Sequence, residues 1–306
     1  MKKRNFITLL DLESEQLTML LDRAVEMKSS GTSMTDYPLM GKSVGILFEK
    51  ASTRTRVSFE VGIYQLGGQA IFLSPRDVHL SRGEPLSDTA MVLSRYLSAL
   101  VVRTFSQETV EKLAEYSTIP VINALTDLTH PCQALADLQT MKENRNTLEG
   151  ARVAYLGDGN NVANSLIIGC SMSGIDLKLA CPEGYDPDPR FLAEGIRRSG
   201  KTGGSVELVR SPEEACRGAH FLYTDVWTSM GQEEESEKRC KDLAAYQLNT
   251  DRLNDAAPDA RILHCLPAHR GEEITEELMD HPQSAIFDQA ENRLHTQKAL
   301  LEWLLA

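Results

Sequence analysis

The sequence predicts an α/β protein with two doubly wound domains, each built on a parallel sheet. Short apolar runs without helical period alternate with longer amphipathic segments, which is typical of parallel strands joined by helices. A chain of 306 residues is long for one hydrophobic core. The polar stretch KENRNTLEG at 142–150 separates two halves with this alternation. We therefore expect domains at 1–146 and 147–306.

In the first half, apolar runs predict four strands, at 43–48, 69–73, 99–103 and 120–124. Amphipathic segments predict the helices between them, at 53–66, 87–97 and 107–117. A further helix begins near Pro131, a residue favoured in the first helical turn. This helix is expected to join the two sheets.

The second half repeats the same rhythm. Its predicted strands cover 152–157, 177–181, 205–209, 220–225 and 261–266. The last segment, 291–306, is an amphipathic helix whose Leu294, Leu301 and Leu304 need a partner surface. The sequence contains no internal repeat.

Composition narrows the class of function. A formal net charge of −12 argues against a nucleic-acid or anionic-membrane surface, because both require an extended basic field. Asp11 ends the first apolar run too early for a signal peptide, and no later run is long enough to cross a membrane. Six cysteines without a C-x-x-C pair indicate reduced thiols. We expect a cytoplasmic protein that binds small ligands.

The stretch STRTR, at 52–56, follows the first strand and opens a helix. A helix N-terminus carries unpaired N–H groups and partial positive charge, and hydroxyls with guanidinium groups add directed donors for an anion. A capped surface helix is the alternative, because Ser and Thr are common N-caps. No Walker loop is present.

Other polar residues also follow predicted strands, where ligands bind in open parallel sheets. Arg103 ends the third strand, and a second strand-end arginine favours convergence on one anion. His130 and Gln133 lie at the mouth of the helix that begins at Pro131. In the second half, the residues that follow strand ends in the same way are Asn160, Asn161, Asp225, His264 and Cys265. Ser229 and Met230 belong to the loop after Asp225, which could close over a ligand.

Two other interpretations are weaker. His130, Cys132, His264, Cys265 and His269 invite a zinc site, but their spacings fit no recognised zinc pattern, so no metal is expected. The run YLGDGNNVANSL at 155–166 is similar to a dinucleotide fingerprint without its third glycine. The alternative is a tight turn that needs glycine for its backbone angles alone.

Four motifs together identify a family. STRTR, HPCQ, D-x-x-x-SMG and HCLP occur in the order and at the separations that resemble the aspartate/ornithine carbamoyltransferase family, and the last two resemble its ornithine branch. The resemblance runs from the early helix to ENRLHTQKALL. It implies a first domain that binds carbamoyl phosphate, a second that binds ornithine, and a C-terminal helix at about 290–305 that returns to the first domain.

The resemblance also implies roles for single residues. Arg54, Thr55, Arg103, His130, Asp225, Cys265 and Arg293 are the expected catalytic residues. Asn161, Asp225, Ser229 and Met230 would hold L-ornithine. In a trimer, His79 would reach a neighbouring subunit's site. The expected contacts to carbamoyl phosphate are Ser52, Thr53, Arg54, Thr55, His79, Arg103, His130, Gln133, Cys265, Leu266 and Arg293.

The implied reaction needs no cofactor, and it serves either arginine biosynthesis or the catabolic direction. The δ-amine of ornithine attacks carbamoyl phosphate, and a tetrahedral oxyanion collapses to citrulline and phosphate. Donors such as Arg54, Thr55, His130 and Arg293 would stabilise the growing negative charge. Three groups are candidates for removing the proton from the amine: Asp225, Cys265 and the substrate phosphate. An alternative acceptor is putrescine or an N-acylated ornithine, and aspartate is a weaker candidate. Alternative classes of protein are a nicotinamide-dependent oxidoreductase and a catalytically silent paralogue that acts as an interaction protein.

Overall fold

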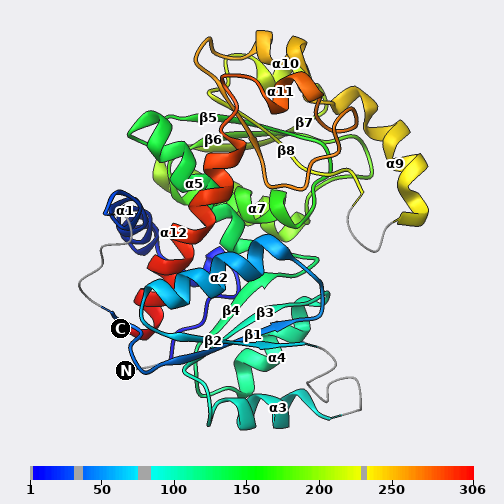
Figure 1. Ribbon diagram of the computed structural model, residues 1–306. Helices are drawn as coiled ribbons and strands as arrows, with labels where there is room; N and C mark the ends of the chain where they lie inside the picture. Colours follow the sequence, from blue (N-terminus) through cyan, green and yellow to red (C-terminus); the bar gives the residue numbers. More distant parts are fainter. Residues whose placement is uncertain (1–2, 31–36, 75–83, 229–232) are drawn as a thin grey trace. The chain divides into compact units, whose positions relative to one another are not determined.

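The computed structural model describes residues 3–30, 37–74, 84–228 and 233–306, and the chain folds into two compact units (Figure 1). The first unit contains Met1–Ala136 and Asn292–Ala306, and the second contains Asp137–Glu291. The chain passes from one unit to the other within α5 (Pro131–Arg145) and returns within α12 (Ile286–Leu305). Each unit is built on a parallel sheet, as predicted.

The first unit contains a four-stranded sheet with the order β2-β1-β3-β4. Its strands are β1 (Ser43–Phe48), β2 (Gln69–Leu73), β3 (Ala99–Arg103) and β4 (Val121–Leu125). All neighbours pair in parallel, and β1, β3 and β4 are almost wholly buried because helices cover both faces of the sheet. The strand order reverses between β1 and β3, which makes their carboxyl ends the expected place for a ligand.

Helices cover both faces of this sheet. Residues of α3 (Leu86–Leu93) and α4 (Gln107–Tyr116) form an apolar cluster with β1, β3 and β4. On the opposite face lies α2 (Thr53–Gln65) (Figure 1), where a Cβ at Gly62 would come within 3.3 Å of the Lys298 side chain. α3 is shorter than predicted, because the chain leaves the helix at Ser94 and continues in turns. The remaining helices of this unit are α1 (Ser14–Ser29) and the 3-10 turn Leu9–Asp11.

The second unit contains a five-stranded parallel sheet with the order β7-β6-β5-β8-β9. Its order reverses between β5 and β8. All nine predicted strands are therefore present, each within two residues of its predicted ends. The strands of this sheet are β5 (Arg152–Leu156), β6 (Asp176–Ala180), β7 (Ser205–Val209), β8 (Phe221–Thr224) and β9 (Arg261–His264).

Two helical layers complete the second unit. α6 (Asn161–Met172) is buried along almost its whole length and packs against α7 (Pro189–Thr202). On the other face, α8 (Pro212–Cys216) and α11 (Glu276–Met279) share an apolar cluster with β5, β8 and β9. The other helical segments are α9 (Ser236–Leu243), α10 (Thr250–Asp255) and the 3-10 turns Glu233–Glu235 and Ala244–Tyr246.

The C-terminal part of α12 belongs to the first unit, as expected. Arg23 of α1 forms two hydrogen bonds with the Glu302 carboxylate, at 2.7 and 2.9 Å. Lys298 donates to the Gln65 side chain at the end of α2, at 3.0 Å. All six cysteines are free thiols. Within the described ranges, each helix is too short or too polar to span a bilayer.

Candidate active site

The N-terminus of α2 forms the first part of the site. Ser52 is the N-cap, and its Oγ accepts a hydrogen bond from the Thr55 N–H at 3.3 Å. The Ser52 hydroxyl also donates to Thr55 Oγ1 at 3.0 Å. Thr53 and Arg54 are exposed in the first turn, while Thr55 is buried. The helix therefore presents free N–H groups, hydroxyls and one guanidinium group at the carboxyl end of β1.

Thr55 is the meeting point of two arginines that are far apart in the sequence. Arg293 of α12 donates to Thr55 Oγ1 at 3.0 Å, and Arg103 at the end of β3 approaches the same oxygen at 3.5 Å. Arg293 also donates to the Gln133 amide oxygen at 2.8 Å. All four side chains are buried. Two guanidinium groups on one neutral hydroxyl concentrate positive charge where little water can screen it.

His130 lies directly before α5, within this positive environment. Burial lowers the pKa of His130 well below its ordinary value, and the charges of Arg293 and Arg103 lower it further. The imidazole is therefore neutral at pH 7, and a neutral imidazole retains one N–H donor. Such a group can donate to a carbonyl oxygen without losing a proton.

The other basic residues near STRTR are engaged elsewhere. Lys50 is buried, forms a 2.6 Å ion pair with Asp127 and lies over the Phe105 ring. Arg56 pairs with Glu60 at 2.8 Å, one turn further along α2, and its guanidinium stacks over Phe72. Of the three cations in this stretch, only Arg54 is left to face a ligand at the helix N-terminus.

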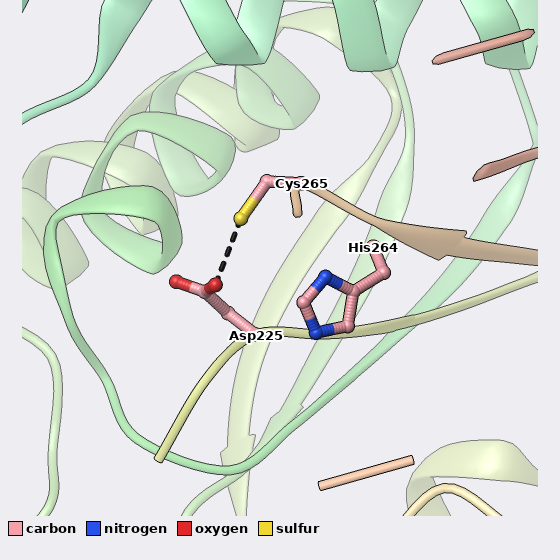
Figure 2. A group of neighbouring side chains, drawn as sticks. All are labelled: Asp225, His264 and Cys265. Carbon is pink, nitrogen blue, oxygen red and sulfur yellow. Dashed lines mark hydrogen bonds between the residues drawn. The ribbon is translucent and has the colours of Figure 1, made fainter. Parts of the chain in front are cut away.

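A second group of polar side chains lies at the order reversal of the second sheet. Asp225, just after β8, accepts a hydrogen bond from the Asn160 side-chain amide at 2.7 Å. It also accepts one from the Cys265 thiol at 2.8 Å, as Figure 2 shows. Asn160 also caps α6, since its Oδ1 accepts from the N–H groups of Val162 and Ala163. Asn161 is the first residue of that helix. A buried carboxylate held in this way suits an ammonium or amine group.

The glycines of the β5–α6 turn have a structural explanation. Gly157 has a φ of +124°, which side chains rarely allow. A Cβ at Gly159 would lie 2.2 Å from the backbone nitrogen of Pro187, and the Gly159 N–H donates to the Tyr185 carbonyl. The chain's own backbone thus packs against the turn where a pyrophosphate would approach. This disfavours the dinucleotide interpretation.

Asp225, His264 and Cys265 lie close enough to suggest a metal, with one ligand atom of each within 4.8 Å of the others (Figure 2). The two ring nitrogens of His264 are already used, however. The Leu266 N–H donates to Nδ1 at 2.9 Å, and Nε2 contacts the Glu273 carboxylate at 3.1 Å. His264 therefore orients the turn that carries Cys265 and Leu266, where Leu266 has a φ of +57°.

Arg239 of α9 fixes the surroundings of Asp225 and was not among the predicted site residues. It is buried, forms an ion pair with Asp158 in the β5–α6 turn, and donates to the Trp227 carbonyl oxygen. Burial raises the pKa of Asp158 to about 6, although Arg239 favours the charged carboxylate. One arginine thus connects the segment before Asn160 with the segment after Asp225.

The structure brings the predicted residues together in two groups. In the first unit, hydrogen bonds connect Ser52, Thr55, Arg103, Gln133 and Arg293. In the second unit, Asp225 and Cys265 are in contact, and Asn161 begins the helix that Asn160 caps.

Three predicted residues, His79, Ser229 and Met230, lie outside the described residues. Sequence reasoning did not identify Asn160 as the direct partner of Asp225, and it missed Arg239 and Glu273. Arg239 ends the acidic run QEEESEKR, whose composition is typical of a solvated helix face, and Glu234, Glu235 and Glu237 are exposed. A basic residue at the end of that run was the available signal.

Comparisons with known proteins place the chain in a family. Residues 4–143 match the family model "Aspartate/ornithine carbamoyltransferase, carbamoyl-P binding domain", and residues 149–304 match its "Asp/Orn binding domain". The ornithine carbamoyltransferase of Gloeobacter violaceus is 54% identical over 301 residues, covering 98% of this chain and 95% of the relative. That of Acinetobacter baumannii is 52% identical over 306 residues, covering 100% and 98%.

Solved structures give the same result. The ornithine carbamoyltransferase of Pyrococcus furiosus superposes with a TM-score of 0.94 at 47% identity, covering 97% of this chain and 96% of that one. The anabolic ornithine carbamoyltransferase of Campylobacter jejuni gives 0.93 at 39% identity, covering 98% of each. These family models, identities and coverages show that the chain belongs to the aspartate/ornithine carbamoyltransferase family.

Proposed function

We propose that this protein transfers the carbamoyl group of carbamoyl phosphate to the δ-amine of L-ornithine, giving L-citrulline and inorganic phosphate (EC 2.1.3.3). The observation that carries the proposal is the meeting of Arg293 and Arg103 at Thr55, beside the N-terminus of α2. This arrangement supplies positive charge, N–H groups and hydroxyls for one phosphate. The full-length ornithine carbamoyltransferase relatives support ornithine as the acceptor.

In this proposal the first unit binds carbamoyl phosphate. The phosphate oxygens receive donors from Ser52, Thr53, Arg54, Thr55 and Arg103. Arg293 and Gln133 already share a hydrogen bond and would turn toward the carbamoyl group. Because His130 is neutral, its imidazole donates a hydrogen bond to the carbonyl oxygen and need not serve as an acid.

The second unit binds the amino acid. Asp225 accepts from the α-ammonium group, and the side-chain amide of Asn161 meets the carboxylate. Ser229 and Met230 complete the contacts to ornithine. Cys265 and Leu266 line the reacting end of the amine. Because the Cys265 thiol already donates to Asp225, the thiol and the carboxylate are connected for moving the proton that the amine must lose.

The chemical step is a nucleophilic addition followed by elimination. The lone pair of the δ-amine forms the C–N bond, the carbonyl π pair moves onto oxygen, and the returning pair expels phosphate. Negative charge grows on the carbonyl oxygen and on the leaving oxygen. Fixed donors near both, from His130, Arg54, Thr55 and Arg293, stabilise the transition state more than the ground state.

Assembly and cellular setting are part of the proposal. We infer a homotrimer in which His79 contributes to a neighbouring subunit's site, and a cytoplasmic role in arginine biosynthesis. The acidic composition and the absence of a long apolar run in the sequence are compatible with this setting.

A citrulline assay tests the function. Purified protein with carbamoyl phosphate is expected to form product with L-ornithine, and far less with putrescine, N-acetylornithine or L-aspartate at equal concentration. If one of these three compounds reacted faster than L-ornithine, it would replace ornithine as the assigned acceptor. Absence of a carbamoylated product with all four would indicate a silent paralogue.

A further inference from the structure

A buried side-chain amide completes the outer edge of β9 near the end of that strand. β9 is an edge strand of the second sheet. On its outer edge, the Ile262 N–H donates to the Gln283 carbonyl at 3.0 Å, and the Ile262 carbonyl accepts from the Ala285 N–H at 2.9 Å. After Ala285 the chain turns into α12, so this backbone pairing stops. Two residues further along β9, the His264 N–H donates instead to Oε1 of the Gln289 side chain, at 2.9 Å.

The other end of the Gln289 amide is held by Asp137 of α5 and Tyr223 of β8. Its Nε2 donates to Asp137 Oδ1 at 2.6 Å and to the Tyr223 hydroxyl at 3.2 Å. The Tyr223 hydroxyl in turn donates to Asp137 Oδ2 at 3.1 Å. Because a carboxylate can only accept, Nε2 must face Asp137, and Oε1 must then face the His264 N–H. The amide therefore has one orientation that satisfies all these partners.

This network is closed to water. Asp137, Tyr223 and Gln289 are 0% exposed, and His264 is 1% exposed. The Tyr223 ring also stacks on Tyr155 of the neighbouring strand β5, with ring centroids 5.7 Å apart, which keeps its hydroxyl in place. Water cannot reach such a site to replace a lost partner, so removing the amide would leave a buried N–H without its acceptor.

The network ends at two side chains of the proposed reaction. Tyr223 lies two residues before Asp225, and His264 directly precedes Cys265. The Cys265 thiol donates to Asp225 Oδ1 at 2.8 Å (Figure 2). A hydrogen bond weakens steeply as its distance and angle change, so this contact tolerates little movement of either strand end. Connecting both strand ends to one amide keeps the thiol and the carboxylate together.

We propose that Gln289 is a positioning residue of this site. Supported by Asp137 and Tyr223, its amide holds the end of β9 and acts through that strand. The Cys265 thiol is thereby kept on Asp225, where the δ-amine of ornithine reacts. The effect on catalysis rests on the proposed function, whereas the effect on the thiol does not.

Alkylation of Cys265 tests the positioning without using the reaction. Cys240→Ser is the reference protein, because Cys240 and Cys265 are partly exposed while the other four cysteines are buried. In this background, Gln289→Met keeps the length of the side chain and removes both the donor and the acceptor. Iodoacetamide should then label Cys265 at least about threefold faster, because a neighbouring carboxylate disfavours the reactive thiolate and would have moved away.

Citrulline formation tests the consequence for the reaction. Gln289→Met should lower kcat at least about tenfold, because a displacement of about 1 Å near a reacting group can cost about a hundredfold. The KM for carbamoyl phosphate, most of whose proposed donors lie in the first unit, should change less than about threefold. Gln283→Met is the matched control, since this amide also donates to two partners, the carbonyls of Pro258 and Ala260. It should be labelled and turn over as the reference protein does.

Tyr223→Phe is a milder variant of the same network. It removes the hydroxyl that donates to Asp137 and accepts from Gln289, and it leaves a ring that can stack on Tyr155. Labelling of Cys265 should be faster than in the reference protein and slower than in Gln289→Met. Circular dichroism verifies that each variant is folded, and Tyr223→Phe decides the question if Gln289→Met does not fold.

Two results would overturn the positioning role. One is labelling of Cys265 at the reference rate in the folded Gln289→Met and Tyr223→Phe proteins. The other is an equal acceleration in Gln283→Met, because the effect would then come from a general loosening of the fold. Faster labelling in the two network variants, with no citrulline formed even by the unaltered protein, would refute the proposed function and still support the positioning of Cys265.

Discussion

Arg54 and Arg56 differ by two positions, but the structure gives them different tasks. Arg54 is exposed in the first turn of α2, whereas Arg56 pairs with Glu60 and stacks on Phe72. If Arg54 stabilises charge on the leaving phosphate, Arg54→Ala lowers kcat by at least about a hundredfold, the usual effect of losing one such donor. Steady-state citrulline formation measures the effect.

Arg56→Ala is the matched control for this experiment. It removes a surface ion pair worth at most about 1 kcal/mol, so kcat is expected to change less than about threefold. Equal losses in the two variants would mean that the helix N-terminus as a whole, and not Arg54, is sensitive to charge.

His130 predicts a pH dependence of stability. Its pKa in the folded protein lies well below the ordinary value of 6.5, because burial and two arginines oppose its protonation. Between these two pKa values the unfolded chain binds a proton that the folded protein does not. The stabilising contribution is thus complete above pH 6.5 and is lost as the pH falls through the folded pKa, at up to about 1.4 kcal/mol per pH unit.

Urea unfolding of the protein and of His130→Asn between pH 7 and pH 5 measures this contribution. The free energy of unfolding of the variant should fall less steeply in this range, because it lacks the group. Parallel slopes for the two proteins would contradict the assignment of a neutral, buried His130.

At the scale of secondary-structure elements, α9 supports the residues proposed to bind ornithine. Its Arg239 pairs with Asp158, two residues before Asn160, and donates to the carbonyl of Trp227, two residues after Asp225. Asn160 and Asp225 are themselves hydrogen-bonded. Removing one partner of a buried ion pair costs about 3–5 kcal/mol. We expect Arg239→Ala to raise the KM for ornithine by more than about tenfold and to change the KM for carbamoyl phosphate much less. Initial-rate kinetics with each substrate varied in turn separate the two constants.

Two further variants make this test specific. Arg239→Lys keeps the charge and should recover part of the affinity for ornithine. The recovery is partial because an ammonium group lacks the planar guanidinium that contacts Asp158 and the Trp227 carbonyl together. Arg190→Ala, in α7, removes the ion pair between Arg190 and Asp188. Because the Arg190 side chain is 74% exposed, this change should leave both KM values unchanged. Equal increases in both KM values for Arg239→Ala would instead indicate a general loss of structure.

The elements also explain how far the sequence could be interpreted. Buried strands such as β1, β3 and β4 were predicted because strands of a sheet covered on both faces appear as continuous apolar runs. The edge strands β2 and β7 are only partly buried, but they also appear as short runs between helical segments. The strand-end rule then found Thr55, Arg103 and Asp225, because the carboxyl ends of parallel strands share one edge. The contacts of Arg293 with Thr55 and of Glu273 with His264 could not be derived in this way. They depend on how α12 and the turn after β9 pack, which no local pattern encodes.

At the scale of the whole molecule, an apolar stripe on α2 bears on the predicted trimer. Val57, Val61 and Tyr64 follow one face of this helix at intervals of four and three residues and are 49%, 37% and 78% exposed. The same helix presents Ser52 and Thr55 at its N-terminus. Large apolar side chains gathered on one face indicate contact with another protein surface. We expect this stripe to be covered by a second copy of the chain.

Tyr64→Glu tests this expectation, since a carboxylate buried in an apolar interface without a partner is strongly unfavourable. Light scattering coupled to gel filtration should show the mass of a trimer for the unaltered protein and a smaller species for the variant. Ile196→Glu, at a 52% exposed apolar position of α7 in the other unit, is the control and should leave the mass unchanged. If His79 acts in a neighbouring site, the Tyr64→Glu species should also lose activity on dilution below the concentration at which it dissociates. A trimer that persists in Tyr64→Glu would exclude this face of α2 from the interface.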